Sequence, residues 1–479
     1  MVSSGGVTES ERVLGDLCSR AFLRLWTHQN LFRNQGRRNG KGDGKELADV
    51  LIVCGDDVII FSDKSCHFST SAPLEVAWDR WFRNSIVENA NQTYGAERWL
   101  RDFPTKVYRD RRCTIPFEVQ LPARGVARVH RVAVASGLKQ ASIARPDTEP
   151  SLRISPGVVG NDHLTKKGGL PFVVGQVNPA KGYVHIWDAL SVERLLQELD
   201  TISDLLRYLR WKENLIASGG LLTAASESDL LGYFMLHRED EPSVRTAGSS
   251  STPLTIKAGS WKQWVNSKLR ANRYRENRVS YFCDELINQM TDRLLQGETL
   301  DPIADPGGTA EACFRRLARE PRLARRGIAH AWLERINDPA LMAAGAARVL
   351  RSMDGQTVYV IIVAPKLPGQ SEEEYRDLRF KFLEVYCFGA MSAQSPPAHL
   401  IGFAMEPRNT RLDGLDVVYY DPANWTEEAQ AEAAKIRQEQ RILTNVQPNL
   451  RFVVDTPGGK TESYLRQLGL APIPRTRRS

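Results

Sequence analysis

Long apolar runs are missing from this sequence of 479 residues. The longest are short pieces such as Val358–Val363, far below the roughly 20 consecutive residues that a membrane-spanning helix needs. The N-terminal stretch MVSSGGVTESER also lacks a charged segment followed by an apolar one, so no secretory signal is expected. These absences predict a protein without a transmembrane segment and without a membrane partner.

Closely spaced cysteines are also absent. The seven cysteines are odd in number and scattered, and no two of them form a CxxC pair. Zinc ribbons and disulfide frameworks depend on such spacings, so neither is expected. The cysteine usage is typical of a reduced, cytoplasmic protein.

Several common catalytic motifs are missing as well. The chain contains no GxGxxG fingerprint, no HExxH motif and no GxSxG elbow. Its eight histidines are dispersed, and we interpret His28, His67 and His130 as ordinary polar residues rather than metal ligands.

The remaining composition is that of a globular protein with more than one domain. A hydrophobic share of 42% and a charged share of 25% exclude a mostly disordered or coiled-coil chain. The length predicts two or three domains. The 64 lysines and arginines exceed the 57 acidic residues and give a net charge of +7, which permits a nucleic-acid partner without requiring one.

Hydrophobic periodicity predicts helices and strands along the whole chain. In the N-terminal part we expect, in order, a helix over 9–28, a hairpin of strands 47–54 and 58–61, a helix over 73–102, a strand over 129–135, a strand pair over 171–177 and 183–187, and a helix over 192–215. In the C-terminal part we expect a strand over 358–364, a helix over 371–390, strands over 399–405 and 415–420, and a helix over 426–443. The second group alternates in the way that is typical of an α/β domain.

The predicted hairpin carries polar residues where apolar ones are expected. Asp49 lies within the first strand, and the triplet Ser62-Asp63-Lys64 closes the second. Only apolar residues and a turn lie between them, so both strands are expected to be buried, where a charge is costly unless it is paired or bound to a metal. The hairpin therefore predicts an acid and an ammonium group close together. The alternative is a surface hairpin in which Asp49 caps a turn and Lys64 is solvated.

This pattern resembles the PD-(D/E)xK, or restriction-endonuclease-like, nuclease superfamily. The likeness rests on an acid in one strand, an acid-x-lysine at the end of the next strand, and the order helix, hairpin, helix, strand. It implies that Asp49 holds Mg²⁺ (or Mn²⁺) and that Lys64 polarises the attacking water. Glu46 and Glu11 are the further candidate metal ligands, Asp63 is a candidate catalytic acid, and Gln92 and Ser62 are supporting residues.

One position departs from the superfamily pattern. Ser62 stands two residues before Lys64, where the pattern has an acid, and strand alternation should point Asp63 to the opposite face. Three alternatives follow: a bulge rotates Asp63 into the site, Glu46 or Glu11 replaces the missing ligand, or the site no longer cleaves. A working metal site needs Asp49, Lys64 and a further carboxylate within about 4–6 Å of one another.

Clusters of basic residues supply candidate contacts to nucleic acid. Arginine and lysine bind phosphates, and interleaved aromatic rings can stack on bases, although a solvated amphipathic helix has the same pattern. The candidates are Arg37, Arg38, Lys41 and Lys45 before the hairpin, Arg270, Arg273 and Arg275 in the aromatic-rich stretch 261–281, and Arg315, Arg316 and Arg319 in the stretch 313–327.

Together these features predict a multi-domain α/β protein. We expect a restriction-endonuclease-like αββαβ core with accessory elements over residues 1–218, a helical basic region over 219–350 and a C-terminal α/β domain over 351–479. The predicted function is metal-dependent cleavage of nucleic acid, with DNA favoured over RNA, and a role in bacterial antiviral defence would suit the layout. The alternative is a non-catalytic nucleic-acid-binding or assembly protein on a degenerate nuclease core, with a protein partner or a second copy bound through the C-terminal domain.

Overall fold

The computed structural model is a mixed α/β protein made of two compact units, residues 1–271 and 272–479. It describes residues 8–35, 42–117, 119–138, 151–217, 222–237, 254–295, 310–336, 346–352, 354–393, 398–407 and 414–443. The predicted division into residues 1–218, 219–350 and 351–479 stays a prediction. No helix among the residues described is both long and apolar enough to cross a membrane.

A six-stranded mixed sheet lies at the centre of the first unit, in the order β4-β1-β2-β3-β5-β8. Its strands are β1 (Thr27–Arg33), β2 (Lys45–Cys54), β3 (Asp57–Ser65), β4 (Val107–Tyr108), β5 (Arg128–Ser136) and β8 (His185–Trp187). β1, β2 and β3 are antiparallel neighbours, whereas β5 runs parallel to both β3 and β8. A two-residue turn joins β2 to β3, and Gly55 takes a φ of 62° there, which glycine adopts at little cost.

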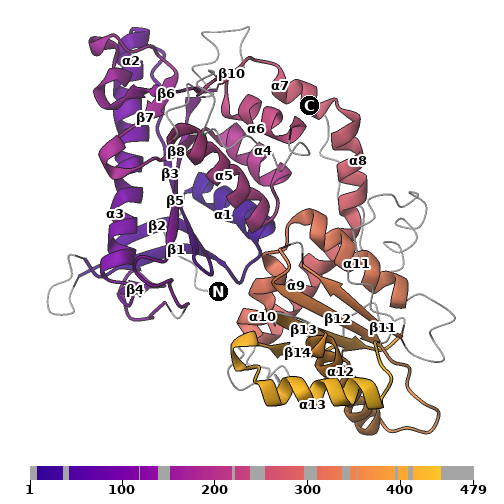
Figure 1. Ribbon diagram of the computed structural model, residues 1–479. Coiled ribbons are helices and arrows are strands. Elements are labelled where there is room, and N and C mark those ends of the chain that lie inside the picture. The colour runs from indigo at the N-terminus through magenta and orange to yellow at the C-terminus, as the bar shows by residue number, and fades with distance from the viewer. Residues whose placement is uncertain are drawn as a thin grey trace. The chain divides into compact units, whose positions relative to one another are not determined.

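Helices cover both faces of this sheet (Figure 1). On one face, α3 (Glu88–Asp102) packs Ala96 and Leu100 against a cluster that contains Leu51 and Ile60. On the other face, α1 (Glu9–Phe22) packs on β1, β2 and β3. α2 (Leu74–Trp81) and a π-helical turn over Phe82–Val87 lead directly into α3. Both strands of the hairpin are therefore buried on both faces, as their apolar runs predict.

The rest of the first unit contains a smaller sheet and further helices. The sheet has the order β10-β9-β6-β7, with β6 at Arg153–Val159, β7 at Val173–Gln176, β9 at Leu222–Ala224 and β10 at Leu254–Ile256. The helices are α4 (Ala189–Glu198), α5 (Ile202–Ala217), α6 (Glu227–Leu236) and α7 (Ser260–Val265). α8 (Lys268–Asn277) contains the boundary between the two units.

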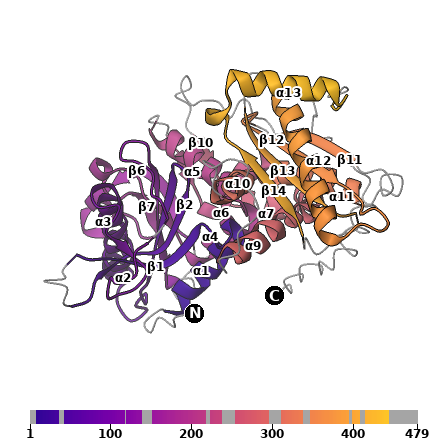
Figure 2. The same ribbon diagram turned by 90° about the horizontal axis from the view of Figure 1, so that it is seen from below.

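The second unit is a layered α/β fold around a four-stranded sheet in the order β11-β12-β13-β14. The strands are β11 (Ala346–Arg351), β12 (Thr357–Val363), β13 (His399–Met405) and β14 (Asp416–Tyr420). The helices are α9 (Tyr281–Leu295), α10 (Ala310–Ala318), α11 (Arg322–Ile336), α12 (Glu372–Ser392) and α13 (Glu427–Glu439), and α12 and α13 lie side by side in Figure 2. α12 packs Leu383 and Cys387 on the sheet at Leu400, whereas Trp332 of α11 contacts Phe403, which alternates to the other face.

The elements expected in the second unit beyond residue 355 are all present, and so are the hairpin, the helical stretch 73–102 and the strand at 129–135. Three expectations for the first unit are wrong. The first helix ends at Phe22 because Leu23 takes a φ of 70°, and strand β1 follows where helix was expected. The helix expected over 192–215 is two helices, because Thr201 caps a new one by accepting a hydrogen bond from the Asp204 amide (3.1 Å). The strands near 171–177 and 183–187 do not pair, since β7 and β8 belong to different sheets.

Candidate active site

The hairpin opens where its polar residues begin. The regular pairing of β2 with β3 ends at Val50 and Phe61. One residue further on, the Asp49 carboxylate accepts a hydrogen bond from the backbone amide of Asp63 (2.6 Å). The side chain of Asp49 thus occupies a position that a backbone carbonyl would take in a continued ladder. It is 4% exposed, so this carboxyl group lies inside the protein.

An irregularity in β2 brings Glu46 to Asp49. On the β1 side, Leu31 pairs with Ala48 whereas Phe32 pairs with Glu46, so β2 has one additional residue at Leu47. Side chains alternate along a regular strand, and residues three positions apart would face opposite ways. With the additional residue, the side chains of Glu46 and Asp49 come close enough to share a hydrogen bond.

Glu11 and Asp63 complete a group of four acids. Glu11 lies in the first turn of α1, where its carboxylate accepts from the Thr8 amide (2.9 Å) in a capping box. Asp63 is buried and accepts hydrogen bonds from Ser10 of α1 and from Ser136 Oγ of β5 (3.3 Å for the latter). Its second oxygen, Oδ2, has no hydrogen-bond partner in the described part of the chain. We call Glu11, Glu46, Asp49 and Asp63 the carboxylate cluster.

Burial and neighbouring acids make three members of the carboxylate cluster, Glu46, Asp49 and Asp63, hard to ionise. Burial and then the charge of Glu46 raise the pKa of Asp49 to about 8. Burial followed by the charge of Glu11 raises the pKa of Glu46, and burial also raises the pKa of Asp63. At neutral pH Asp49 therefore keeps its proton, which it can donate in the hydrogen bond with Glu46. Perturbed carboxyl groups of this kind concentrate at functional sites.

Lys64 does not join the carboxylate cluster. Its ammonium group forms an ion pair with Glu88, the first residue of α3, and with none of the four acids. β3 pairs with β5 in unbroken register from Asp57 to Ser65, so no bulge rotates the end of the strand. Asp63 consequently points toward α1 and Lys64 toward α3, as strand alternation predicts. Of the three alternatives, the rotating bulge is wrong, and Asp63 reaches the other acids from its own face.

Neither of the two supporting residues, both of which the structure describes, forms a hydrogen bond with the carboxylate cluster. Ser62 is fully buried, and its hydroxyl has no partner within the described ranges. Gln92 lies on α3 and is partly buried. The π-helical turn before α3 is a rare geometry that is common at functional sites.

The predicted nucleic-acid contacts are placed in different environments. Arg37, Arg38 and Lys41 lie outside the described residues, whereas Lys45 is exposed at the start of β2. In the aromatic-rich stretch, Arg275 is exposed on α8, and Arg270 forms an ion pair with the buried Glu198 (2.7 Å). Arg273 is partly exposed on the same helix. This stretch therefore offers a mixture of solvated and internally paired cations.

The arginine cluster of α10 and α11 is held together by acids of the same unit. Asp284 binds Arg322 (2.7 Å) and also Arg325, and both arginines are almost completely buried. Arg326 pairs with Glu276 (2.6 Å). Closely spaced arginines repel one another unless negative charge lies nearby. In this cluster part of that negative charge comes from the protein's own Asp284 and Glu276. The three predicted contacts in this cluster, Arg315, Arg316 and Arg319, are partly exposed.

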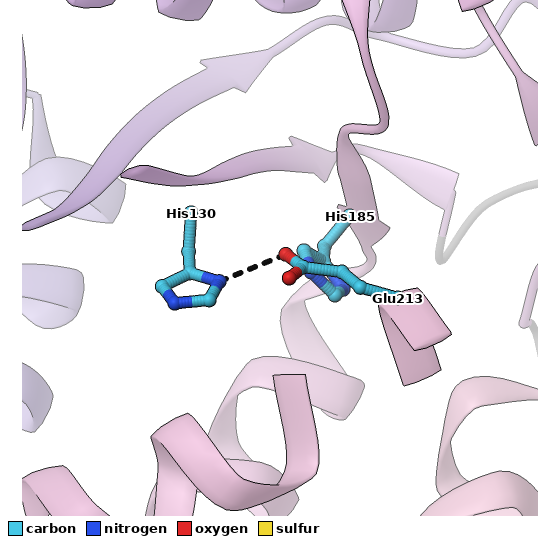
Figure 3. Close-up of side chains that lie close together, drawn as sticks. All are labelled: His130, His185 and Glu213. Carbon is cyan, nitrogen blue, oxygen red and sulfur yellow. Dashed lines mark hydrogen bonds and ion pairs between the residues drawn. The ribbon is translucent and has the colours of Figure 1, made fainter. Parts of the chain in front are cut away.

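A second group of polar side chains was not expected from the sequence. His130 of β5 and His185 of β8 both contact the carboxylate of Glu213 on α5, as Figure 3 shows. We call these three residues the histidine–glutamate cluster. Burial alone would raise the pKa of Glu213, but hydrogen bonds from the two imidazoles outweigh it and lower the pKa to about 2. Burial lowers the pKa of His185, which stays neutral and still has one N–H to donate.

The sequence did contain a signal for this second group. Each histidine interrupts a strand that is otherwise mainly apolar, in Val129-His130-Arg131-Val132 and in Val184-His185-Ile186-Trp187. The interpretation of His130 as an ordinary polar residue rested on the wide spacing of the histidines. Residues 130, 185 and 213 meet only through the fold.

Comparisons of the chain with models of protein families, with curated proteins and with solved structures find no match.

Proposed function

We propose that this protein is a metal-dependent nuclease that hydrolyses phosphodiester bonds in nucleic acid. The observation that carries the proposal is the convergence of Glu11, Glu46, Asp49 and Asp63 from three elements at the open end of one hairpin. Burial and neighbouring acids raise the pKa values of Glu46, Asp49 and Asp63, which makes their ionisation costly to the fold, and a divalent cation would remove that cost.

The order of elements supports a restriction-endonuclease-like core. α1, the hairpin β2–β3, the helices α2 and α3 and the strand β5 follow one another as that core requires, with β5 parallel to β3. Asp49 lies in the first hairpin strand, where the superfamily carries an acid, whereas Asp63 stands one residue after the position of the second acid, which Ser62 occupies. β1 adds a strand on the far side of β2.

The residues of the cluster fit Mg²⁺ or Mn²⁺. Both ions take oxygen ligands, and Mg²⁺ is commonly held by one or two carboxylates with water completing its shell. No three of the four acids, all within the described residues, bring one oxygen each to within 4.8 Å of one another, and Lys64 is paired with Glu88. The expected grouping of Asp49, Lys64 and a further carboxylate is therefore not met, and an ion here would take at most two of the acids directly, with water as its other ligands. Glu46 and Asp49 would hold the ion, and the unpartnered Oδ2 of Asp63 would accept from one of its waters. A bound ion of this kind lowers the pKa of its water and offsets charge on the phosphate.

The chain's own residues orient these acids. The Asp63 amide fixes the carboxylate of Asp49, and Ser136 fixes one oxygen of Asp63 and leaves the other available. Lys64 is held by Glu88 on the other side of β3, so the proposal assigns it no contact with the scissile phosphate.

The deciding experiment is incubation of the full chain with duplex and single-stranded DNA and RNA in Mg²⁺ or Mn²⁺. We expect cleavage that EDTA abolishes, and we expect Asp49→Ala to lose more than the ~10–100-fold that removal of a metal ligand's hydrogen-bond partner costs. Asp56→Ala is the matched control, because Asp56 is an exposed acid in the turn of the same hairpin. Equal cleavage by wild type and Asp49→Ala would overturn the site assignment.

Lys64 provides a second and sharper test. Because its partner is Glu88, we expect Lys64→Ala to retain cleavage to within about tenfold, and Glu88→Gln to behave similarly. Loss of cleavage in Lys64→Ala that is as complete as in Asp49→Ala would mean that the lysine acts at the reaction centre, and it would contradict its placement here.

One observation favours a second function, a nucleic-acid-binding protein on a core that no longer cleaves. Ser62 occupies the position of the second strand acid, and Lys64 is engaged elsewhere. For that function we expect gel shifts with nucleic acid that Asp49→Ala leaves unchanged, and no cleavage of any of the four substrates with either metal.

A further inference from the structure

The histidine–glutamate cluster is built from three separate elements of the first unit. In the sheet, Val132 of β5 pairs with His185 of β8, and His130 lies two residues before Val132. Residues two apart share a face, so both imidazoles project from the same face of neighbouring parallel strands. Glu213 meets them from α5, which ends a few residues later at Ala217.

The polar contacts of both rings converge on one point. Nδ1 of His130 lies 2.8 Å from Oε1 of Glu213, and Nε2 of His185 lies 2.9 Å from the same oxygen. The other ring nitrogens, Nε2 of His130 and Nδ1 of His185, have no hydrogen-bond partner among the residues described. Among the residues described, neither imidazole therefore has a hydrogen bond outside the cluster, although the ring of His185 packs against Tyr183 and Trp187.

The spacing of the three atoms matches a metal ligand set. Within the described ranges this is the only trio of histidine, cysteine or acidic residues whose ligand atoms all lie within 4.8 Å of one another. Bonds of about 2.0–2.1 Å in a tetrahedral zinc site separate the ligand atoms by roughly 3.3–3.4 Å. The contacts of 2.8 and 2.9 Å need to lengthen by only about half an ångström to admit the ion.

The surroundings allow a cation and a solvent ligand. The side chains of His130 and His185 are 4% and 0% exposed, whereas that of Glu213 is 28% exposed, so water reaches the cluster from the carboxylate side. Lys212 is the nearest cation on α5, and its charge is balanced by Glu227 at 2.5 Å. A divalent ion at the cluster would therefore not face an uncompensated ammonium group.

We propose that His130, His185 and Glu213 bind Zn²⁺, with water as the fourth ligand. Two imidazoles and one carboxylate form a donor set that zinc accepts and that Mg²⁺, which takes oxygen ligands, does not favour. The site is separate from the carboxylate cluster and does not depend on the proposed nuclease function. In the β3–β5 register Ile59 pairs with His130 and Asp63 with Val134, so the two clusters lie four residues apart along the strands, or about 13 Å.

The unpartnered ring nitrogens set the expected strength of the site. Metal-binding histidines usually donate their second N–H to an acceptor, and loss of such a partner typically lowers affinity about 10–100-fold. We therefore expect a site that a strong chelator empties completely and that refills when the metal is returned.

The test uses the full-length protein, stripped with EDTA, dialysed and titrated with Co²⁺ and with Zn²⁺. We expect one equivalent of Co²⁺ to give the intense visible absorption of a four-coordinate site, and Zn²⁺ to displace it. Glu213→Gln and His185→Gln should each weaken binding at least tenfold. His237→Gln is the control, because His237 is an exposed histidine at the end of α6, and it should bind like wild type.

Thermal unfolding separates loss of the site from loss of the fold. A glutamine carbonyl can still accept from both rings, but it lacks the negative charge that the lowered pKa of Glu213 shows the fold to favour. Metal-free Glu213→Gln should therefore fold but melt below metal-free wild type, and the readout is the shift that Zn²⁺ adds to each protein. Zn²⁺ should raise the melting temperature of wild type and of His237→Gln, but not that of Glu213→Gln. Failure of wild type to bind one equivalent of either metal, or unchanged binding in Glu213→Gln and His185→Gln, would overturn the proposal. Neither result bears on cleavage by the carboxylate cluster.

Discussion

Asp49 holds a proton that an ordinary aspartate would have lost. Its pKa of about 8 follows first from burial and then from Glu46, three residues away in the sequence. The raised pKa means that ionising Asp49 destabilises the fold, and under the proposed function a bound cation would remove this destabilisation. Since the cost comes from ionising Asp49 inside the protein, a neutral side chain of the same shape should remove it.

Asp49→Asn should therefore stabilise the metal-free protein at high pH. An acid whose pKa rises on folding binds more protons in the native state, so stability falls as the pH increases from about 4 to about 8. Asparagine imitates the protonated acid: it can accept from the Asp63 amide and donate to Glu46. In EDTA, we expect the variant to match wild type at pH 4 and to exceed it at pH 8, by an amount that the pKa of about 8 limits to about 5 kcal/mol.

Urea unfolding at both pH values measures this difference. Asp56→Asn, at the exposed turn of the same hairpin, should show no such pH-dependent gain. If Asp49→Asn is less stable than wild type at pH 8, Asp49 is ionised in the native protein and its pKa is not raised. The same variant should lose metal-dependent cleavage at every pH.

Helices and strands with a strong apolar pattern or a clear cap could be predicted from the sequence. Those that form only because they pair with another strand could not. The runs in β12 and β13 and the capped start of α12 at Ser371 are local signals, and these elements lie where they were expected. β1, with the sequence Thr-His-Gln-Asn-Leu-Phe-Arg, has no apolar run and is a strand because it pairs with β2. The residues of the carboxylate cluster were all among the candidates taken from the sequence, and their role stays a prediction. The place of Lys64 depended on which helix lies on which face of β3.

The ion pairs that join α9 to α11 can be tested by substitution. Asp284 of α9 binds two buried arginines of α11, Arg322 and Arg325, so its loss would remove a carboxylate that pairs with both. Breaking a buried ion pair from one side costs about 3–5 kcal/mol. We expect Asp284→Ala to destabilise the protein by that order, and Glu285→Ala, at the next and more exposed residue of α9, by less than about 1 kcal/mol.

Chemical denaturation of the two variants distinguishes a structural role for these arginines from a ligand-binding one. Equal stability of Asp284→Ala and Glu285→Ala would show that Arg322 and Arg325 do not need Asp284. A structural role for their ion pairs with Asp284 would then be wrong.

For the whole molecule, the excess of seven positive charges is divided between cations that hold the fold together and cations that face solvent. α8 carries both kinds within six residues. Arg270 is paired with Glu198, which is itself buried, whereas Arg275 is exposed. The net charge therefore overstates how many cations are exposed for a nucleic acid to bind. Substitution of Arg270 should change the stability of the fold, whereas substitution of Arg275 should change binding.

If the protein binds nucleic acid through α8, Arg275→Ala should weaken binding without changing the melting temperature. Each phosphate contact that is lost should lower the slope of log K against log salt by about 1, whatever the sequence of the DNA. Arg270→Ala should instead lower the melting temperature, because it breaks an ion pair with the buried Glu198, and should leave the salt slope nearly unchanged. Both expectations are tested by measuring nucleic-acid affinity from 50 to 200 mM salt and the melting temperature for each of the two variants. An unchanged slope in Arg275→Ala would remove α8 from the binding surface, since its solvent-facing arginine would then contact no phosphate.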